Sequence, residues 1–490
     1  MHQRPASTPR SGPTTAREHT LHDLIVIGAG SAGLSAAALA ASVGADVALI
    51  EANAIGGDCT WTGCVPSKAL LHIAKAAHTV RTAGHLGLQT QLTGVDMAQV
   101  RRTIAARIQE VYQHESPQAL ANKGITVITG RARFTSPDTI VVSGQPMRAR
   151  HFILCTGAHP RPLNIPGIDT VTAHNHHTIF DNDRLPEHLI VVGAGPIGAE
   201  IAQAYGRLGA QVSLVGPALL PKESPQTTAI IQEALQHSGA RFIPARAASV
   251  CPNSPHPHGL TLTLNDGQQI HGDMLMVAIG RTANIDGLGL DQAGIQTTHG
   301  VIHVNSTLHT SNPRVLAAGD CNGSPQFTHL AGWQGVMAAR NALFPLQTDA
   351  LGRRPPRVTF TDPEVAAVGL SFAQAKQRFG QHALRAHRPL THVDRAVCDH
   401  ATAGFIELIH HSDGRLLGAT LVGPRAGDAL SGLVVALEHN LKLKELATAL
   451  HPYPTYAIGI QQLAADLYTQ QSLDTTAVRL LKKWKGYHKA

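Results

Sequence analysis

The sequence predicts an α/β fold with two strand–helix–strand units, followed by a C-terminal α+β region. Two glycine-rich motifs predict the units, and short strands that alternate with helices after residue 355 predict the last region. The length of 490 residues suits about three domains of ~150 residues each. With 43% hydrophobic residues, the composition is that of an ordinary globular protein with ample core.

The first unit runs from the apolar strand DLIVIGAG through the helical segment SAGLSAAALAASVGA to a second strand, DVALIE. Gly28, Gly30 and Gly33 have the spacing of a turn in which the backbone approaches a pyrophosphate at a helix N-terminus. Glu51 ends the second strand 18 residues after Gly33, close to the ~20 expected of an acid that binds a ribose. These features predict a Rossmann-like dinucleotide site, with a chance glycine turn as the alternative.

The second unit, HLIVVGAGPIGAEIAQAYGRLGAQVSLVG, repeats this pattern with Gly193, Gly195 and Gly198. At the place equivalent to Glu51 it has Gly216, so no carboxylate is present to bind a free 2′-hydroxyl or to repel a 2′-phosphate. Lys222 is the nearest cation downstream. The second site is therefore expected to prefer NADPH, although NADH stays possible.

Charge and composition favour small anionic ligands. The formal net charge is +7, and the basic residues are scattered without a nucleic-acid-binding motif, so nucleic acid is not an expected partner. No apolar run approaches ~18 residues, so neither a membrane span nor a membrane partner is expected. Residues 1–20 are expected to be a disordered tail, with a transit peptide as the alternative, and 476–490 a basic amphipathic tail. The expected location is cytoplasmic.

Two of the six cysteines, Cys59 and Cys64, lie close together in GGDCTWTGCVPSKAL. Such a pair can be a structural disulfide, part of a metal site or a redox-active disulfide. Five steps of regular helix rise ~7.5 Å, more than the ~4.4–6.8 Å between bridged Cα atoms, so Cys59 must precede the helix or lie in a distorted first turn. A close pair in a reducing cytoplasm is more often catalytic or metal-binding than structural. Zinc sites need a second ligand pair, which is not evident, and no metal site is expected.

Seven motifs together carry a specific resemblance: GAGSAG, GGDCTWTGCVPSK, CTGAHPRP, GAGPIGAE, AIGRTAN, TSNPRVLAAGD and PRVTFTDPEVAAVG. The chain resembles the flavin-dependent pyridine nucleotide–disulfide oxidoreductases, the group of dihydrolipoamide dehydrogenase, glutathione reductase and mercuric reductase. The resemblance extends from about Asp23 to Tyr468, and HVDRAVCDHATAGF is most similar to the mercuric reductase-like branch.

The resemblance implies a homodimer that holds FAD in the first unit and NAD(P)H in the second, with a C-terminal dimerisation domain whose end completes the partner's active site. Turn-rich stretches suggest the boundaries. The expected domains are FAD-binding, 21–160 and 285–350; NAD(P)-binding, 161–284; and dimerisation, 355–475.

For the cysteine pair, the resemblance implies a redox disulfide in which Cys64 faces the flavin and Cys59 meets the acceptor. Lys68 follows Cys64 by one helical turn and is expected to pair with Glu200. A cation there favours a thiolate. The glycine motifs and the resemblance together imply these cofactor contacts: Gly28, Gly30, Ser31, Ala32, Gly33, Glu51, Gly57, Asp58, Lys68, Gly130, Thr156, Gly157, Ala158, Gly193, Gly195, Pro196, Ile197, Gly198, Glu200, Gly280, Arg281, Gly319 and Asp320.

The segment HPYPTYAIGIQQLA departs from the disulfide-reducing members of the group. Those enzymes carry a His-Pro sequence with a Glu five residues after the His, as an acid–base pair. Aligned through the proline, this chain has Tyr453 and Ile458 at those two positions. A tyrosine, with a pKa near ~10, is a poor base at neutral pH but can donate a hydrogen bond, and His451 is a second acid–base candidate.

In having a tyrosine at position 453, the chain resembles mercuric reductase, although the additional cysteine pairs of that enzyme are absent from this sequence. The leading prediction is an FAD-dependent NAD(P)H oxidoreductase that passes electrons through the cysteine pair to Hg(II) or another metal ion, a quinone or a disulfide. A dihydrolipoamide dehydrogenase-type disulfide reductase is the alternative. A redox-sensing flavoprotein without turnover is the alternative from another class.

Overall fold

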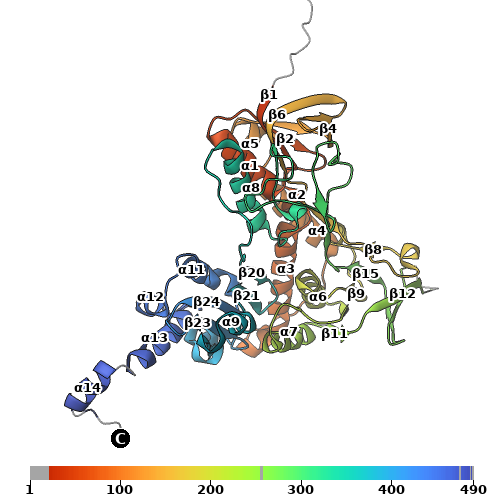
Figure 1. Cartoon of the computed structure of the whole chain (residues 1–490). Coiled ribbons are helices and arrows are strands. Elements are labelled where there is room, and N and C mark those ends of the chain that lie inside the picture. Colours follow the sequence, from red (N-terminus) through yellow and green to blue (C-terminus); the bar gives the residue numbers. More distant parts are fainter. Residues whose placement is uncertain (1–20, 254–257, 474–475, 486, 488–490) are drawn as a thin grey trace, which may run out of the picture.

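The structure, a computed structural model, describes residues 21–253, 258–473, 476–485 and 487, so the tail expected at residues 1–20 lies outside the described residues. Three bodies surround the long helix α3 (Cys64–Thr82): the first unit, the second unit and the C-terminal region (Figure 1). α3 starts beside the first body and packs along the second. Residues in its first turns therefore lie where the bodies meet.

The first body is a seven-stranded sheet of order β3-β2-β1-β6-β5-β4, with β19 beside β6. The pairs β1–β2, β1–β6, β2–β3 and β6–β19 are parallel, whereas β4, β5 and β6 pair antiparallel. Its elements are β1 (Leu21–Ile27), α1 (Ser31–Ser42), β2 (Val47–Glu51), α4 (Met97–Tyr112), α5 (Pro117–Ala121), β3 (Ile125–Thr129), β4 (Ala132–Ser136), β5 (Thr139–Val142), β6 (Gln145–Leu154), β19 (Val315–Ala317) and α8 (Thr328–Leu343).

The close packing of α1 on α8 requires a glycine, because a Cβ on Gly335 would lie 2.0 Å from the carbonyl oxygen of Ala32. This contact brings the start of α8 to the cysteine segment, although the two are far apart in the sequence.

The second body is a parallel sheet of order β11-β10-β9-β15-β8, beside an antiparallel sheet β12-β13-β14. Its buried strands are nearly continuous apolar runs, as expected of a parallel sheet that is covered on both faces. Its elements are β8 (Ala173–His174), β9 (His188–Val192), α6 (Pro196–Leu208), β10 (Gln211–Gly216), α7 (Pro225–His237), β11 (Ala240–Pro244), β12 (Ala247–Pro252), β13 (Leu260–Leu264), β14 (Gln269–Gly272) and β15 (Met274–Val277).

A two-stranded ribbon lies between these bodies, where β7 (Ala158–Pro160) pairs antiparallel with β16 (Arg281–Ala283). It joins the end of CTGAHP to the GRTAN motif. Two further short strands, β17 (Thr297–Thr298) and β18 (Val301–Ile302), form their own ribbon.

The third body is an antiparallel sheet of order β20-β21-β24-β23-β22, with α11 packed on β21 and β24. It has the α+β organisation predicted for the C-terminal region. Its elements are β20 (Arg357–Thr359), β21 (Glu364–Gly369), α9 (Phe372–Phe379), β22 (Ala383–Pro389), α10 (Asp394–Cys398), β23 (Phe405–His411), β24 (Leu416–Gly423), α11 (Ala426–Glu438), α12 (Leu443–Thr448), α13 (Ile458–Leu473) and, beyond the body, α14 (Thr476–Lys485).

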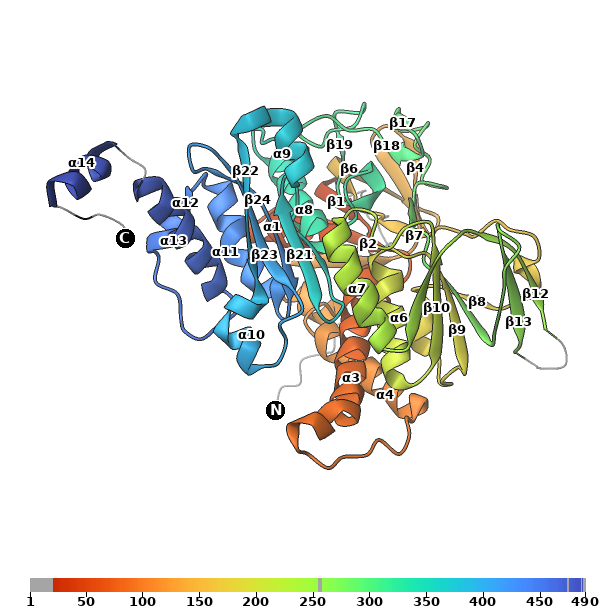
Figure 2. The same cartoon turned by 90° about the horizontal axis from the view of Figure 1, so that it is seen from below.

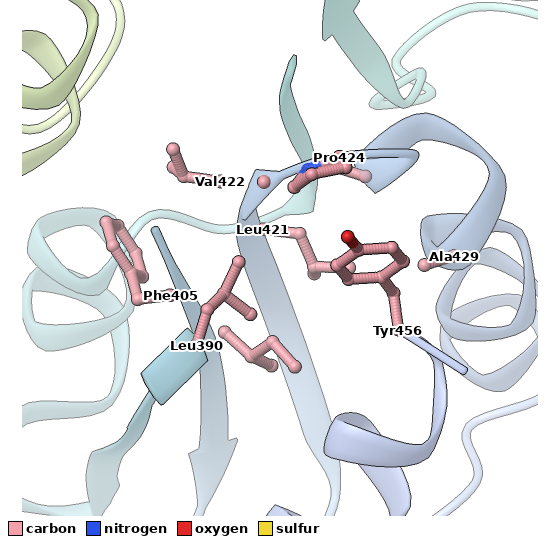
Figure 3. A pocket seen from close by; sticks show the side chains of 10 residues that line it. Leu390, Phe405, Leu421, Val422, Pro424, Ala429 and Tyr456 are labelled. Carbon is pink, nitrogen blue, oxygen red and sulfur yellow. The ribbon is translucent and has the colours of Figure 1, made fainter. Parts of the chain in front are cut away.

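A small apolar cavity lies in this body between Leu390, Leu421, Pro424 and Tyr456 (Figure 3). Apart from the Tyr456 hydroxyl, its lining carries no polar side chain. Among the helices that the structure describes, none has the length and apolar character to cross a membrane.

Candidate active site

The cysteine segment forms two helices rather than one. Cys59 lies in the short helix α2 (Gly57–Trp61), and Cys64 is the first residue of α3. The chain reverses between them at Gly63, where a Cβ would lie 2.7 Å from the carbonyl oxygen of Asp58. The break explains how cysteines five positions apart can meet, as their spacing required. The indole of Trp61 fixes the loop by donating to the carbonyl oxygen of Ile55 at 2.7 Å.

Both cysteines are free in the structure, without a disulfide between them, and a hydrogen bond links their side chains. The bond from Cys59, helped by the Thr328 hydroxyl and the charge of Lys68, outweighs burial and lowers the pKa of Cys64 to about 6. The same bond, together with burial, raises the pKa of Cys59. One proton is thus shared by the pair, with Cys64 as the thiolate and Cys59 as the thiol.

Thr328 is the first residue of α8, and its hydroxyl lies 3.3 Å from the Cys64 sulfur. A hydrogen bond donated to a thiolate favours the charged form. The sequence analysis missed this residue, because 264 positions separate it from Cys64 and no motif marks it.

Lys68 and Glu200 form the ion pair that the resemblance implied, with 2.9 Å between Nζ and Oε2. The second carboxylate oxygen of Glu200 accepts from the backbone N–H of Phe360 at 2.9 Å, and the Lys68 ammonium lies 4.2 Å from the centre of the Phe360 ring. Only 8% of the Glu200 side chain is exposed, so both oxygens are held. The pair fixes a positive charge beside Cys64.

The face of α6 that carries Glu200 also holds the start of the third body. Gln203 exchanges two hydrogen bonds with the backbone of Asp362, at 2.7 and 2.9 Å. Arg207 donates to the Asp362 carboxylate at 2.9 Å, and Lys75 lies 3.5 Å from it. These groups line a polar cleft that reaches Lys68. The sequence analysis did not identify this network.

The glycine turn of the first unit fits a dinucleotide. Gly28 and Gly33 are required by packing, because a Cβ on Gly28 would lie 2.3 Å from the Cys155 carbonyl oxygen and one on Gly33 would lie 1.8 Å from the Gly28 carbonyl oxygen. A Cβ on Gly30 would meet only the Cα of Gly57, at 3.9 Å. Gly30 is the N-cap of α1, with no side chain capping the helix. An open backbone with free helix N–H groups is the cradle that a pyrophosphate needs.

The second turn has the same division of roles. A Cβ on Gly193 or Gly198 would lie 2.3 or 1.8 Å from a carbonyl oxygen, whereas a Cβ on Gly195 would have no neighbour within 4 Å. Gly195 caps α6 without a side-chain hydrogen bond, and Pro196 and Ile197 begin the helix. This turn also fits a pyrophosphate.

The strand ends after the two turns differ. Glu51 accepts from the backbone N–H groups of Ala29 and Asn53, each at 2.7 Å, so its carboxylate stands beside the glycine turn. Gly216 lies against Ala194, and a Cβ there would come within 2.8 Å of the Ala194 Cβ. The second site therefore has no room for an acid at this position, and Lys222 follows in an exposed turn.

Arg281 ties together two acids from distant motifs. Its guanidinium pairs with Asp58, and with Asp320 at 2.6 Å. Burial would raise the pKa of Asp58, but the neighbouring His176 imidazole and the charge of Arg281 hold it at about 2. Burial raises the pKa of Asp320 despite Arg281. Among the described residues, the buried Nε–H of Arg281 has no hydrogen-bond partner. This N–H group is therefore available to donate to a bound cofactor.

Two histidines that the sequence analysis missed face the same acid. Nε2 of His176 lies 3.7 Å and Nε2 of His177 lies 3.3 Å from the Asp58 carboxylate, and both nitrogens are buried without a hydrogen bond. Two histidines and a carboxylate are a ligand set for a transition metal. However, the Arg281 cation already occupies the Asp58 carboxylate, which disfavours a second cation, so these donors suit the cofactor cleft better than a metal.

The other predicted cofactor contacts gather around the ribbon and the strand ends of the first sheet. Thr156 donates to the carbonyl oxygen of Asn284 at 2.6 Å, and the Asn284 side chain donates back to the Thr156 carbonyl oxygen at 2.9 Å. Ser31, Ala32 and Gly57 lie at the start of helices, Gly130, Gly157 and Gly319 follow strands of the first sheet, and Ala158 and Gly280 lie at or beside the β7–β16 ribbon.

The C-terminal candidates are not brought to the cysteines within one chain. The Tyr453 hydroxyl donates to the carboxylate of Asp394 at 2.7 Å, and the side chain of Tyr453 is exposed. His451 contacts only a backbone carbonyl among the described residues, and Ile458 begins α13. The hydrogen bond to Asp394 raises the pKa of Tyr453. By the alignment through the proline, Tyr453 and Ile458 take the positions of the His and the Glu, and Tyr453 is paired instead with Asp394 of α10.

These features define a class of protein. The chain belongs to the pyridine nucleotide-disulphide oxidoreductase family, whose pattern matches residues 22–335 and whose dimerisation domain matches residues 355–464. It is an FAD-dependent flavoprotein disulfide reductase of class I with a Cys59–Cys64 redox pair, and its family uses FAD and NAD(P)H. The family membership, the fold class and the enzyme class that the sequence predicted are confirmed.

The relatives divide between two activities. Mercuric reductase of Staphylococcus aureus is 33% identical over 448 residues, covering 90% of this chain and 82% of that protein. Dihydrolipoyl dehydrogenase of Thermus scotoductus is 32% identical over 461 residues, covering 92% and 98%. LpdA of Mycobacterium tuberculosis has the same fold, with a TM-score of 0.83 at 30% identity over 91% of this chain and 99% of that one. Sequence identity alone does not identify the acceptor.

Proposed function

We propose that the enzyme reduces a thiophilic metal ion such as Hg(II) with NADPH, through the Cys59–Cys64 pair. The observation that carries this proposal is the Tyr453–Asp394 pair, with Ile458 where a glutamate would complete a proton-transfer dyad. Release of a dithiol from a disulfide substrate needs proton transfer at neutral pH, whereas a soft metal ion binds thiolates directly. A quinone, which accepts electrons without thiol exchange, is compatible with the same site.

The chain's own residues account for the charge that develops at the cysteines. A disulfide that receives a hydride equivalent, two electrons and one proton, becomes one thiol and one thiolate. The lowered pKa of Cys64 places the thiolate there, beside Lys68 and Thr328, and the proton stays on Cys59. Bound FAD supplies two-electron transfer between the nicotinamide and the disulfide. The open glycine turns at Gly30 and Gly195 are the proposed phosphate sites of FAD and NADPH.

The NADPH preference rests on the strand end of the second unit. Gly216 leaves no acid to repel a 2′-phosphate, and Lys222 supplies a nearby cation. Comparison of kcat/KM for NADPH and NADH tests it. A several-fold preference for NADPH that disappears in Lys222→Ala supports the assignment, and a strong NADH preference would refute it.

The matching dimerisation domain implies a homodimer. We place Tyr453 and His451 at the Cys59 of the partner subunit, because the exposed segment that carries them has no contact with the cysteines of its own chain among the printed interactions of the described residues.

A panel of Hg(II), Cu(II), quinones, lipoamide, glutathione disulfide and oxygen tests the acceptor. NADPH oxidation that depends on Hg(II) and is lost in Cys59→Ser supports the proposal. The dihydrolipoyl dehydrogenase relative keeps lipoamide as the second candidate, and rapid lipoamide turnover without Hg(II) turnover would replace the first by the second. No turnover with any acceptor, although NADPH reduces the cysteines, would indicate a redox sensor.

A further inference from the structure

Helix α14 presents large apolar side chains to solvent. Leu480 is 62% exposed, Leu481 51% and Trp484 76%. The helix projects away from the third body in both views (Figures 1 and 2). It also lies beyond the dimerisation-domain match, which ends at residue 464. The family match therefore does not account for these exposed side chains.

The charges of the same helix have one sign. Residues 476–485 contain Arg479, Lys482, Lys483 and Lys485 and no acid. With Lys489, the segment after residue 475 holds five of the seven net positive charges of the chain.

The two kinds of side chain occupy opposite faces. At about 100° per residue, Leu480, Leu481 and Trp484 fall within an arc of roughly 100°, and the four basic residues occupy the rest of the circumference. Lys485 Nζ lies 4.7 Å from the centre of the Trp484 ring, so the basic and apolar faces meet at a Trp–Lys contact. Tryptophan and lysine together are typical of the headgroup region of a bilayer.

We propose that α14 binds the surface of an anionic lipid membrane, with its apolar face among the acyl chains and its basic face on the headgroups. Charge complementarity favours lipid over a second copy of this chain, because the net charge of each copy is positive. The helix lies on the membrane rather than across it, since it is far too short to span one. This revises the expectation of no membrane partner and is independent of the electron acceptor.

Co-sedimentation of the full-length holoenzyme with vesicles tests the proposal. Vesicles of phosphatidylglycerol and phosphatidylcholine in equal parts are compared with phosphatidylcholine alone. We expect binding to the anionic vesicles only, with loss at about 0.5 M salt because screening shortens the reach of the charges. A blue shift of tryptophan fluorescence should accompany binding and be absent from Trp484→Phe.

Two double variants test the contributions of the basic face and of the apolar face of α14 to membrane binding separately. Lys482→Glu with Lys483→Glu should lower the partition coefficient at least about tenfold, and Leu480→Ser with Leu481→Ser should also abolish binding. Lys123→Glu with Lys376→Glu makes the same charge change at two exposed lysines elsewhere and should bind normally. Absence of binding at low salt, equal binding to both vesicles, or an altered oligomeric state after truncation at residue 475 without vesicle binding would overturn the proposal.

Discussion

The cysteine site and the Tyr453 segment differ in how completely one chain builds them. Around the cysteines, every charged group is held: Lys68 by Glu200, and Glu200 by both Lys68 and the backbone of Phe360. Tyr453 is 64% exposed and has one partner, Asp394. The contacts that hold the cysteine site all come from one chain, whereas the Tyr453 side chain is mostly exposed to solvent.

We assign different roles to the two regions: the cysteine site sets the position of the thiolate, and the Tyr453 segment acts on the acceptor. The cysteine site uses burial and opposite charges to set where one thiolate lies, which any acceptor in the family requires. We propose that the Tyr453 segment selects the acceptor, because at the two aligned positions it has Tyr453 and Ile458 instead of an acid–base pair. A change at the cysteine site should therefore slow every acceptor, and a change near Tyr453 should be selective.

The largest effect is expected from Cys59→Ser, because it removes the thiol that we propose meets the acceptor. Turnover with any acceptor should fall by on the order of a thousandfold or more. Steady-state NADPH oxidation measures it. Cys251→Ser, a change at an exposed cysteine in the second body, should leave the rate unchanged. If Cys59→Ser kept substantial Hg(II)-dependent activity, electrons would leave by another route.

Lys68→Met should have the next largest effect. It removes the cation beside Cys64 and leaves the nearby Glu200 carboxylate unpaired, so the pKa of that thiol should rise and its thiolate fraction near neutral pH should fall. We expect turnover to fall about ten- to a hundredfold with every acceptor. The pH dependence of alkylation by iodoacetamide reports the thiol directly, and Lys68→Arg is the charge-preserving control. An unchanged profile would show that Lys68 acts only on packing.

Much of the cysteine site could be predicted from local sequence, and its long-range contacts could not. The glycine turns and the break before Cys64 follow from residues close in the chain. The pairing of Lys68 with Glu200, 132 positions away, needed the family resemblance. Thr328 carries no motif and reaches Cys64 only because α1 packs on α8. Asp394 lies within the quoted segment HVDRAVCDHATAGF, but its contact with Tyr453, which lies outside the cysteine site of its own chain, could not be read from that segment. Such contacts depend on tertiary packing, which spacing does not encode.

Thr328→Val should give a smaller effect of the same sign as Lys68→Met. Loss of the hydroxyl removes one hydrogen bond that favours the Cys64 thiolate, and the pKa should rise by about half a unit to one unit. The alkylation rate of the reduced enzyme, which increases as pH rises through that pKa, should shift to higher pH by the same amount. Thr328→Ser keeps the hydroxyl and should restore the original profile. A Val variant with an unshifted profile would mean that the 3.3 Å contact does not stabilise the thiolate.

Asp394→Asn should have the smallest effect and should be confined to the acceptor half of the reaction. Removal of the carboxylate that accepts from Tyr453 should return the raised pKa of that phenol toward its ordinary value and free its position. We expect a two- to fivefold change in turnover with a metal ion or a disulfide, because a change of this size corresponds to the loss of about one exposed hydrogen bond. Rapid-mixing reduction of the enzyme by NADPH should be unaffected. A matching loss in that first step would mean that the two regions are not separable, because the Tyr453 segment would then also control how electrons enter the cysteine pair.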